Sequence, residues 1–410
     1  MKSSKISKIR LEFPAYLYSA QQQKDNSPFY AFFFNFVSVL TCKSAVPIEF
    51  FKVNADSYSC PRFPEPGEIV FAHHAIQKDN PNVWSVKEAP VVSLFAIDPC
   101  GYSGAADIAQ HPEKYEEAIR AITPDVAQAS IARFQQQIFG CQISKYEQPA
   151  HQAELPARFV FFPLQLVDDS VTQFYRFDLL ESIKKAAFYA QKCKTHLVLK
   201  VHPRTKNLET KINQLQTIFF DNPYVKIIDA NVQHLIQKCQ SVLVFNSGVG
   251  LEALIAGKPV YAMGQNEWQQ ACIQVNSLDG LEAAFAFDQP GQTLYQQQVI
   301  AYLLTRYWIR YDDIEAISRK IEWCLGHFQF ERVSSGQPQK MQYVLRSADI
   351  CEESVKKIKR LEQQLRLLDF ENETLRQQLA LPPNHHSQRQ FRRIFGFKNF
   401  WLLKNEGFKS

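Results

Sequence analysis

The chain has 410 residues, of which 46% are hydrophobic and 21% are charged. This length suits two ordinary domains and an appendage, and the composition is that of a folded protein and excludes a largely disordered one. The net charge of +5 is small for such a length and does not by itself indicate a nucleic-acid partner.

Cysteine usage and the N-terminal segment indicate the compartment. The nine cysteines are widely spaced and form no C-x-x-C pair, which argues against a disulfide framework and a zinc site, and for a reducing compartment. Met1–Arg10 is basic, but no long apolar stretch follows it. Phe29–Leu40 is interrupted by Asn35 and is too short to span a bilayer. We therefore expect a soluble protein that is made and kept in the cytoplasm.

Residues 1–155 form the first predicted domain. They contain several short apolar runs, among them Ile69–Ala72 and Val91–Ile97, and the second run leads into a turn-rich loop of the kind that follows a buried strand. His73 and His74 are candidates for the wall that faces the second domain. Paired histidines are more often structural than metal-binding, and no third ligand is evident in the sequence. The loop supplies the other candidates for this wall, which are Gly101, Tyr102, Ser103 and Gly104.

The second predicted domain, residues 156–330, alternates strands and helices. This alternation predicts βαβ units and a parallel sheet that is covered on both faces. Ligands bind at the carboxyl ends of the strands of such sheets, where we expect the loops 165–170, 202–206, 246–250 and 264–268 to meet. The predicted strands are Phe159–Leu164, His196–Val201, Val225–Ile228, Val242–Phe245 and Pro259–Met263, and the predicted helices are Leu179–Cys193, Leu208–Phe219, 231–239 and Leu251–Ala256.

The loop 246–250 and the helix after it give the strongest site signal. Four of only 14 glycines fall between positions 248 and 264, where small residues let backbone N–H groups approach a phosphate or ribose at a helix start. Glu252, expected in the first turn, could accept hydrogen bonds from ribose hydroxyls, and Gly257 suits a helix C-cap. A tight, well-capped strand-to-helix turn would explain the same residues, but Asn246-Ser247 before the glycines and Glu252 after them favour a ligand site.

Two further loops hold groups that could carry chemistry. Lys200–Lys206 contains a histidine that a proline follows, beside several cations, which suits the phosphates of a nucleotide sugar. A surface turn with solvated charges would explain this segment equally well. Asp168 and Asp169 could supply a nucleophile or base, although Asp-Asp-Ser is also a helix N-cap sequence, and composition alone favours the cap.

Together, Gln165–Ser170, His202-Pro203 and Asn246–Val260 resemble the Kdo glycosyltransferases of bacterial capsule and lipopolysaccharide assembly. The motifs follow the family order: Pro-Leu-Gln-x-x-x-Asp-Ser, Lys-x-His-Pro, and Asn-Ser-x-x-Gly-x-Glu-Ala-Leu before Gly-Lys-Pro-Val. Gly101–Gly104 is similar to the family's Gly-Tyr-Ser-Gly loop. The resemblance covers roughly residues 90–270, and residues 264–268 depart from the family pattern.

The resemblance implies an α/β GT-B fold, in which two Rossmann-like domains face each other across a cleft. It also implies a CMP-Kdo donor, retention of configuration to give β-linked Kdo, and a glycan or glycolipid acceptor, without a metal or other cofactor. Asp169, which directly precedes the serine of the motif, would be the nucleophile or ion-pair stabiliser in preference to Asp168, and His202 would contact the donor. The predicted donor-binding residues are Gln165, Ser170, Lys200, Arg204, Asn246, Ser247, Gly248, Gly250 and Glu252.

Other functions fit parts of the pattern. A GT-B enzyme with another nucleotide-activated donor or a polyol-phosphate transferase would also use a His-Pro loop, although the second class would be expected to carry a different loop at 246–252. A sugar-nucleotide 2-epimerase would share the Gly-x-x-x-Glu-Ala pattern. A non-catalytic assembly protein could instead use the C-terminal segment.

The C-terminal segment combines a linker, a coiled coil and a basic end. Residues 331–352 are the predicted linker, and apolar residues at steps of three and four over 358–379 predict a coiled coil at 353–381 that pairs with a second copy. Packing against the catalytic body is the alternative. Residues 384–410 interleave six Lys/Arg and one Glu with aromatic residues, which predicts peripheral binding to the inner face of the bacterial inner membrane. Nucleic acid is the rival partner for such a tail, but nothing else in the chain supports it.

Overall fold

A computed structural model describes residues 5–14, 17, 27–53, 62–76, 80–149, 153–166, 169–288 and 290–330. The chain divides into two compact units, Met1–Gln342 and Tyr343–Ser410, and the following description concerns the first unit. The predicted linker, coiled coil and basic tail all lie outside the described residues. Within the described residues, no helix combines the length and the apolar character that crossing a bilayer requires.

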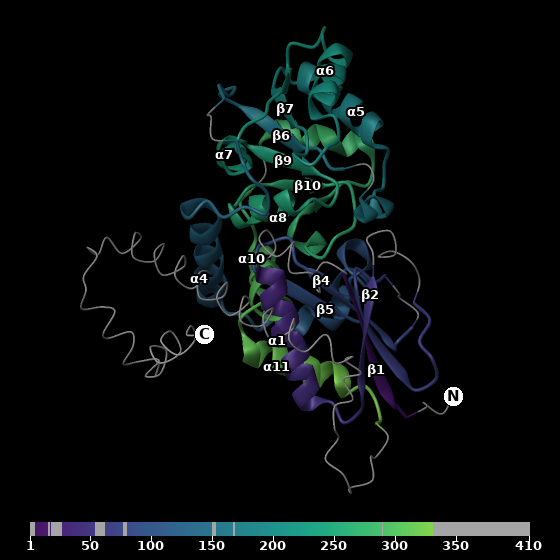
Figure 1. Cartoon of the computed structure of the whole chain (residues 1–410). Coiled ribbons are helices and arrows are strands. Elements are labelled where there is room, and N and C mark those ends of the chain that lie inside the picture. Colours follow the sequence, from purple (N-terminus) through teal and green to yellow (C-terminus); the bar gives the residue numbers. More distant parts are fainter. Residues whose placement is uncertain are drawn as a thin grey trace, which may run out of the picture. The chain divides into compact units, whose positions relative to one another are not determined.

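A six-stranded mixed sheet forms the core of what we call the first lobe. Its strand order is β12-β5-β4-β3-β1-β2, in which β5 runs antiparallel to both neighbours and the other pairs are parallel. Phenylalanine-rich α1 (Ser27–Lys43) packs on this sheet beside α11 (Ile314–Leu325), as Figure 1 shows in purple and green. The strands are β1 (Lys8–Pro14), β2 (Ile48–Val53), β3 (Glu68–His73), β4 (Val83–Glu88), β5 (Leu94–Asp98) and β12 (Ile309–Arg310).

A second six-stranded sheet, parallel throughout, forms the core of the second lobe. Its order, β11-β10-β9-β6-β7-β8, is that of a doubly wound Rossmann sheet, with the direction of winding reversed between β6 and β9. The inner strands are continuous apolar runs because helices cover both faces. The strands are β6 (Phe159–Pro163), β7 (His196–Lys200), β8 (Val225–Ile227), β9 (Ser241–Val244), β10 (Val260–Ala262) and β11 (Ile273–Gln274).

The helices of the second lobe begin at side-chain caps. Asp178 accepts from the backbone N–H of Glu181 at 2.9 Å and starts α5, whose apolar face packs on the sheet. Asn231 caps α7 in the same way through the N–H groups of residues 233 and 234. The helices are α5 (Leu179–Lys192), α6 (Leu208–Ile218), α7 (Val232–Lys238), α8 (Gly248–Ile255) and α9 (Ala283–Ala286).

Further helices connect the lobes. Residues of α4 and α10 join one apolar cluster with residues of β9 and α8, so the two lobes share a continuous core on this side. The remaining helices, all in the first lobe or the connections, are α2 (Asp107–Gln110), α3 (Glu116–Arg120), α4 (Pro124–Gln135) and α10 (Leu294–Tyr302).

The two-lobed α/β architecture confirms the predicted fold class, but the predicted boundary of the second domain at residue 330 is wrong. Ile309 and Arg310 of β12 pair with Phe95 and Leu94 of β5, and Ile317 and Ile321 of α11 are buried against α1. The chain therefore returns to the first lobe for its last described elements. The alternation of strand and helix predicts that these elements exist, but it does not say which sheet they join.

Candidate functional site

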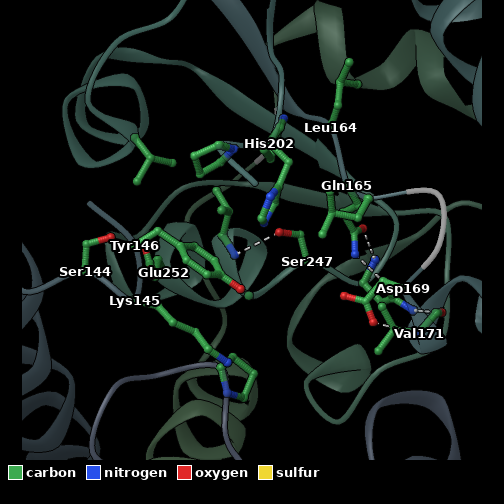
Figure 2. Close-up of a pocket in the computed structure, with 18 of the residues that line it drawn as sticks. Ser144, Lys145, Tyr146, Leu164, Gln165, Asp169, Val171, His202, Ser247 and Glu252 are labelled. Carbon is green, nitrogen blue, oxygen red and sulfur yellow. Dashed lines mark hydrogen bonds between the residues drawn. The ribbon is translucent and has the colours of Figure 1, made fainter. Parts of the chain in front are cut away.

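A cavity lies at the carboxyl ends of the central strands of the second sheet. Its empty volume, open space at the mouth included, is about 1170 Å³. The loops after β6, β7 and β9 form most of its wall, on both sides of the point where the winding reverses. In Figure 2, His202 and Ser247 lie between Asp169 on one side and Tyr146 on the other.

Two amide side chains join the loops on either side of this point. The Gln165 Nε2 donates to the Asn246 Oδ1 at 3.0 Å, and the backbone N–H of Asn246 donates to the Gln165 Oε1 at 3.2 Å. The Asn246 Nδ2 also donates to the carbonyl of Val171 at 2.8 Å. Gln165 and Asn246 line the cavity, and these bonds fix the geometry of its wall.

The start of α8 faces the cavity. Ser247 is the N-cap, and its Oγ accepts from the backbone N–H of Val249 at 3.3 Å. Ser247 and Gly248 line the cavity, where the positive end of the helix dipole favours an anion. At the other end, Gly257 has φ +77°, and its N–H bonds to the carbonyl of Leu254, so the predicted C-cap is confirmed.

Glu252 is a buried carboxylate without a hydrogen-bond partner for Oε2 among the described residues. It lies one turn into α8 rather than in its first turn, and it lines the cavity. Burial raises its pKa from the usual 4.5 to about 7. Leaving such a group unpaired destabilises a fold, so a carboxylate in this position is suited to a hydroxyl donor from a ligand.

His202 follows β7 and presents one ring nitrogen as a donor. The backbone N–H of Arg204 donates to the His202 Nδ1 at 3.1 Å, so the neutral ring carries its proton on Nε2. Burial lowers the pKa of His202, and the Arg204 guanidinium adds to this effect. The ring meets Tyr146 edge to face at 5.0 Å and lines the cavity. Its Nε2–H can therefore donate to a ligand phosphate or carboxylate.

Asp169 is an N-cap, as composition alone favours, and its side chain also lines the cavity. It caps the 3₁₀ turn Ser170–Phe174 with Oδ1, which accepts from the backbone N–H of Val171 at 3.2 Å. The Ser170 Oγ also lies 3.4 Å from this Oδ1. No described residue donates to Oδ2, and the side chain lines the cavity. Asp168, the less favoured aspartate, lies outside the described residues.

The first lobe closes the cavity through the predicted loop 101–104. The Tyr102 hydroxyl donates to the Ser170 Oγ at 2.7 Å, and the backbone N–H of Ser103 donates to the Glu267 Oε1 at 2.7 Å. A Cβ on Gly104 would lie 2.7 Å from the Cβ of Gln265, so only glycine allows this close approach. The loop is thus a contact between the lobes, and Tyr102 and Ser103 line the cavity.

A charged cluster on β3 and β4 forms the floor on the first-lobe side. The Lys87 Nζ lies 2.8 Å from the His74 Nε2, which in turn lies 3.4 Å from the Glu88 Oε2. Burial would raise the pKa of Glu88, but the bond with His74 and the nearby Lys87 charge hold it well below the usual value. Possible metal-ligand atoms of His73, His74 and Glu88 lie within 4.8 Å of one another. The fold therefore brings Glu88 beside the two histidines as a third possible ligand, which the sequence pattern did not show. The Lys87 ammonium at the His74 nitrogen opposes a cation there.

Not every predicted residue lies in the wall. Lys200 lines the cavity, but its ammonium pairs with Asp229 at 2.5 Å. Gly250 lies behind the wall, where a Cβ would meet the Trp268 ring at 2.5 Å, so its small size serves packing. Ser170, Arg204, Gly101 and Gly104 are also absent from the wall. Glu267, in the expected loop 264–268, is in the wall, whereas wall residues that the sequence did not indicate include Lys87, Glu88, Pro90, Lys145 and Tyr146.

A family model described as "Capsule polysaccharide biosynthesis protein" matches residues 85–312, more than half of the chain. The chain belongs to this family. The match begins within the floor strand β4 and spans the loop 101–104, every wall loop of the second lobe and the return of the chain through β12. No curated protein matches the chain.

The chain is similar to several solved structures at low sequence identity. The chain is similar to the β-Kdo 2,7 transferase of Thermosulfurimonas dismutans KpsC, with 14% identity, a TM-score of 0.46, and coverage of 78% of this chain and 99% of that chain. It is also similar to the β-Kdo 2,4 transferase of the same KpsC, with 14% identity, a TM-score of 0.39, and coverage of 76% of this chain and 98% of that chain. A UDP-GlcNAc 2-epimerase of Methanocaldococcus jannaschii matches with 13% identity, a TM-score of 0.32, and coverage of 77% of this chain and 98% of that chain.

Proposed function

We propose that this protein transfers Kdo from CMP-Kdo to a glycan or lipid-linked acceptor, with retention of configuration, in bacterial surface polysaccharide assembly. One observation carries the proposal. An aspartate with one open carboxylate oxygen, an imidazole with an outward N–H and a buried unpartnered glutamate line the same cavity. Membership in the capsule polysaccharide biosynthesis family supports a role in capsule assembly.

The second lobe would hold the nucleotide part of the donor. Glu252 would accept hydrogen bonds from ribose hydroxyls, since its Oε2 has no other described partner. Ser247 and Gly248 at the start of α8 would hold the phosphate, together with the His202 Nε2–H. Neutralisation of the phosphate by these donors would stabilise CMP as it leaves. We expect the reaction to need no metal ion, so that EDTA leaves the rate unchanged.

Asp169 would act as the nucleophile of a double displacement. Its Oδ2 forms a bond to the anomeric carbon while the bond from that carbon to the CMP phosphate oxygen breaks, and the electron pair leaves with CMP. The acceptor hydroxyl oxygen then attacks the same carbon and releases Asp169 as a carboxylate, and the hydroxyl proton passes to the CMP phosphate. Two inversions give net retention.

The first-lobe wall would take the acceptor. Lys87, Glu88 and Tyr102 line the cavity on the side opposite to the nucleotide-facing loops. They place a cation, a carboxylate and a phenol at the side from which an acceptor would approach Asp169.

We also propose that residues 358–379 self-associate and that residues 384–410 hold the protein peripherally on the inner membrane, close to a lipid-linked acceptor. Deletion of residues 384–410 should then release the protein from anionic liposomes, and unchanged binding would refute the anchor.

Trapping of the covalent intermediate tests the proposed reaction. Wild-type protein incubated with CMP-Kdo and no acceptor should gain the mass of one Kdo residue on the peptide that contains Asp169. Asp169→Asn should show no adduct and no transfer while still binding CMP, because the amide keeps the shape of the side chain. Transfer by Asp169→Asn at the wild-type rate would show that Asp169 is not the nucleophile.

A panel of nucleotides separates the rival donors. CMP should raise the Tm more than CDP, UDP or GDP, and Glu252→Gln should reduce that shift. A preference for UDP would instead point to a UDP-sugar transferase or an epimerase, and no response to any nucleotide would favour a non-catalytic assembly protein.

A further inference from the structure

A short chain of hydrogen bonds connects the first lobe to Asp169. The Tyr102 hydroxyl donates to the Ser170 Oγ at 2.7 Å, and the Ser170 Oγ lies 3.4 Å from the Asp169 Oδ1. The second contact is long, as catalytic hydrogen bonds often are before substrate arrives. Tyr102 belongs to the first lobe, whereas Ser170 and Asp169 belong to the second. The chain therefore crosses the contact between the lobes.

The direction of these bonds follows from proton counting. The Tyr102 side chain is only 2% exposed, and burial raises the pKa of its phenol to about 12, so it keeps its proton. Because Tyr102 donates to Ser170, the single hydroxyl proton of Ser170 is left to donate to the Asp169 Oδ1. The backbone N–H of Val171 donates to the same oxygen at 3.2 Å. Both donors thus hold Oδ1 and leave Oδ2 toward the cavity.

The loop that carries Tyr102 is itself fixed on both sides. The Asp98 Oδ1 accepts from the backbone N–H groups of Cys100 and Gly101, at 2.8 Å each. On the far side, Ser103 bonds to Glu267, and Gly104 lies against Gln265 with no room for a Cβ. Gly101 has φ +152° and Ser103 has φ 52°, so the loop keeps a conformation that few sequences adopt. Its phenol therefore has a defined position relative to Asp169.

We propose that Tyr102 is a positioning residue for the nucleophile: through Ser170 it orients the Asp169 carboxylate, and it does so only when the two lobes are in contact. This inference rests on the proposed function, in which Asp169 attacks the donor. It assigns to the Gly-Tyr-Ser-Gly loop a purpose beyond contact with the acceptor. When the lobes separate, Ser170 loses the Tyr102 donor that directs its own hydroxyl proton to Oδ1, so the orientation of the carboxylate depends on closure.

Single-turnover kinetics with CMP-Kdo test the proposal. Tyr102→Phe and Ser170→Ala should each slow formation of the Asp169 adduct about tenfold, the effect of one lost orienting hydrogen bond. The KM for CMP-Kdo should stay within about twofold, because neither hydroxyl is assigned to the donor. The double variant should be no slower than either single variant, since both substitutions break the same chain. Ser170→Thr keeps a hydroxyl and should restore most of the rate.

A matched control separates positioning from general loss of a tyrosine hydroxyl. Tyr115→Phe removes a 2.6 Å bond to the Asp107 Oδ2 within the first lobe, outside the cavity wall, and should leave the adduct rate unchanged. A wild-type rate in Tyr102→Phe, or additive losses in the double variant, would overturn the proposal. Asp169→Asn is measured in parallel. If it reacts normally, the proposed function fails, whereas loss of its activity beside a normal Tyr102→Phe defeats the positioning role alone.

Discussion

Glu252 shows how a single residue can serve ligand binding at a cost to stability. The carboxyl group is buried, its pKa is raised to about 7, and no described residue bonds to Oε2. Below pH 4.5 it is protonated in the folded and unfolded chains alike, so burial costs little. As the pH rises from 4.5 to about 7, the unfolded chain releases this proton while the folded chain keeps it. Stability therefore falls over this window, by about 3 kcal/mol in all.

Substitution of Glu252 by glutamine should remove this pH dependence. We expect the Tm of Glu252→Gln to match that of the wild type near pH 4 and to exceed it increasingly up to about pH 7, in unliganded protein. Glu315→Gln, at a side chain that is 89% exposed, is the control for loss of a glutamate charge at the surface. A Tm difference for Glu252→Gln that is constant with pH would show that the carboxylate is not held in an unfavourable environment.

His202 is the residue through which the donor phosphate can be tested most directly. His202→Ala removes one charge-assisted hydrogen bond from Nε2–H to the phosphate. It should therefore raise the dissociation constant for CMP, measured by calorimetry, roughly 10- to 100-fold. His196→Ala is the control, because His196 begins the same strand at the opposite edge of the sheet. Equal dissociation constants for the two variants would remove His202 from the donor site.

At the scale of elements, the second lobe was largely predictable and the first was not. Strands β6, β7, β9 and β10 are apolar runs that end at polar, glycine or proline residues, so their positions and their shared edge follow from the sequence. Helix α1 is buried over most of its surface, and its many phenylalanines leave no polar face that would mark a helical period.

The candidate site divides in the same way. Asp169, His202 and Ser247 could be predicted because each follows a strand of the same sheet. Lys87 and Tyr146 could not, because they reach the cavity only through the meeting of separate elements. The sequence predicted Gly250 as a donor contact, since a glycine in a phosphate-type loop and a glycine at a packing contact have the same local pattern. The neighbour that decides between them, Trp268, comes from the loop after β10.

Gly250→Ala therefore tests the packing of α8. The added methyl group would lie 2.5 Å from the Trp268 ring and 3.0 Å from Val244, so we expect the free energy of unfolding to fall by about 1–3 kcal/mol. Gly291→Ala is the control, because nothing lies within 4 Å of its Cβ position. Equal stability of the two variants in urea denaturation would contradict the packing assignment.

At the scale of the described unit, each lobe has an apolar cluster of its own beside the core that the two lobes share, and α11 contributes to the cluster of the first lobe. Ile321 of α11 is fully buried with α1, and Ile183 of α5 is buried in the second lobe. Replacement of either isoleucine by alanine should lower the stability of the lobe that contains it by about 2–5 kcal/mol. Hydrogen exchange should then accelerate in α1 for Ile321→Ala and in β6 and β7 for Ile183→Ala. If Ile321→Ala instead accelerated exchange only in β6 and β7, α11 would belong to the second lobe.

The return of β12 and α11 also sets an order of events during synthesis. A ribosome releases the whole second sheet, β6 to β11, before it releases β12. The lobe that begins the chain must therefore wait, with β5 unpaired on one edge and α1 uncovered, until the lobe that follows it has emerged. Nascent chains arrested before residue 309 should thus bind chaperones through the first lobe, although it is made before the second, the reverse of the N-terminal-first folding usual for multidomain proteins.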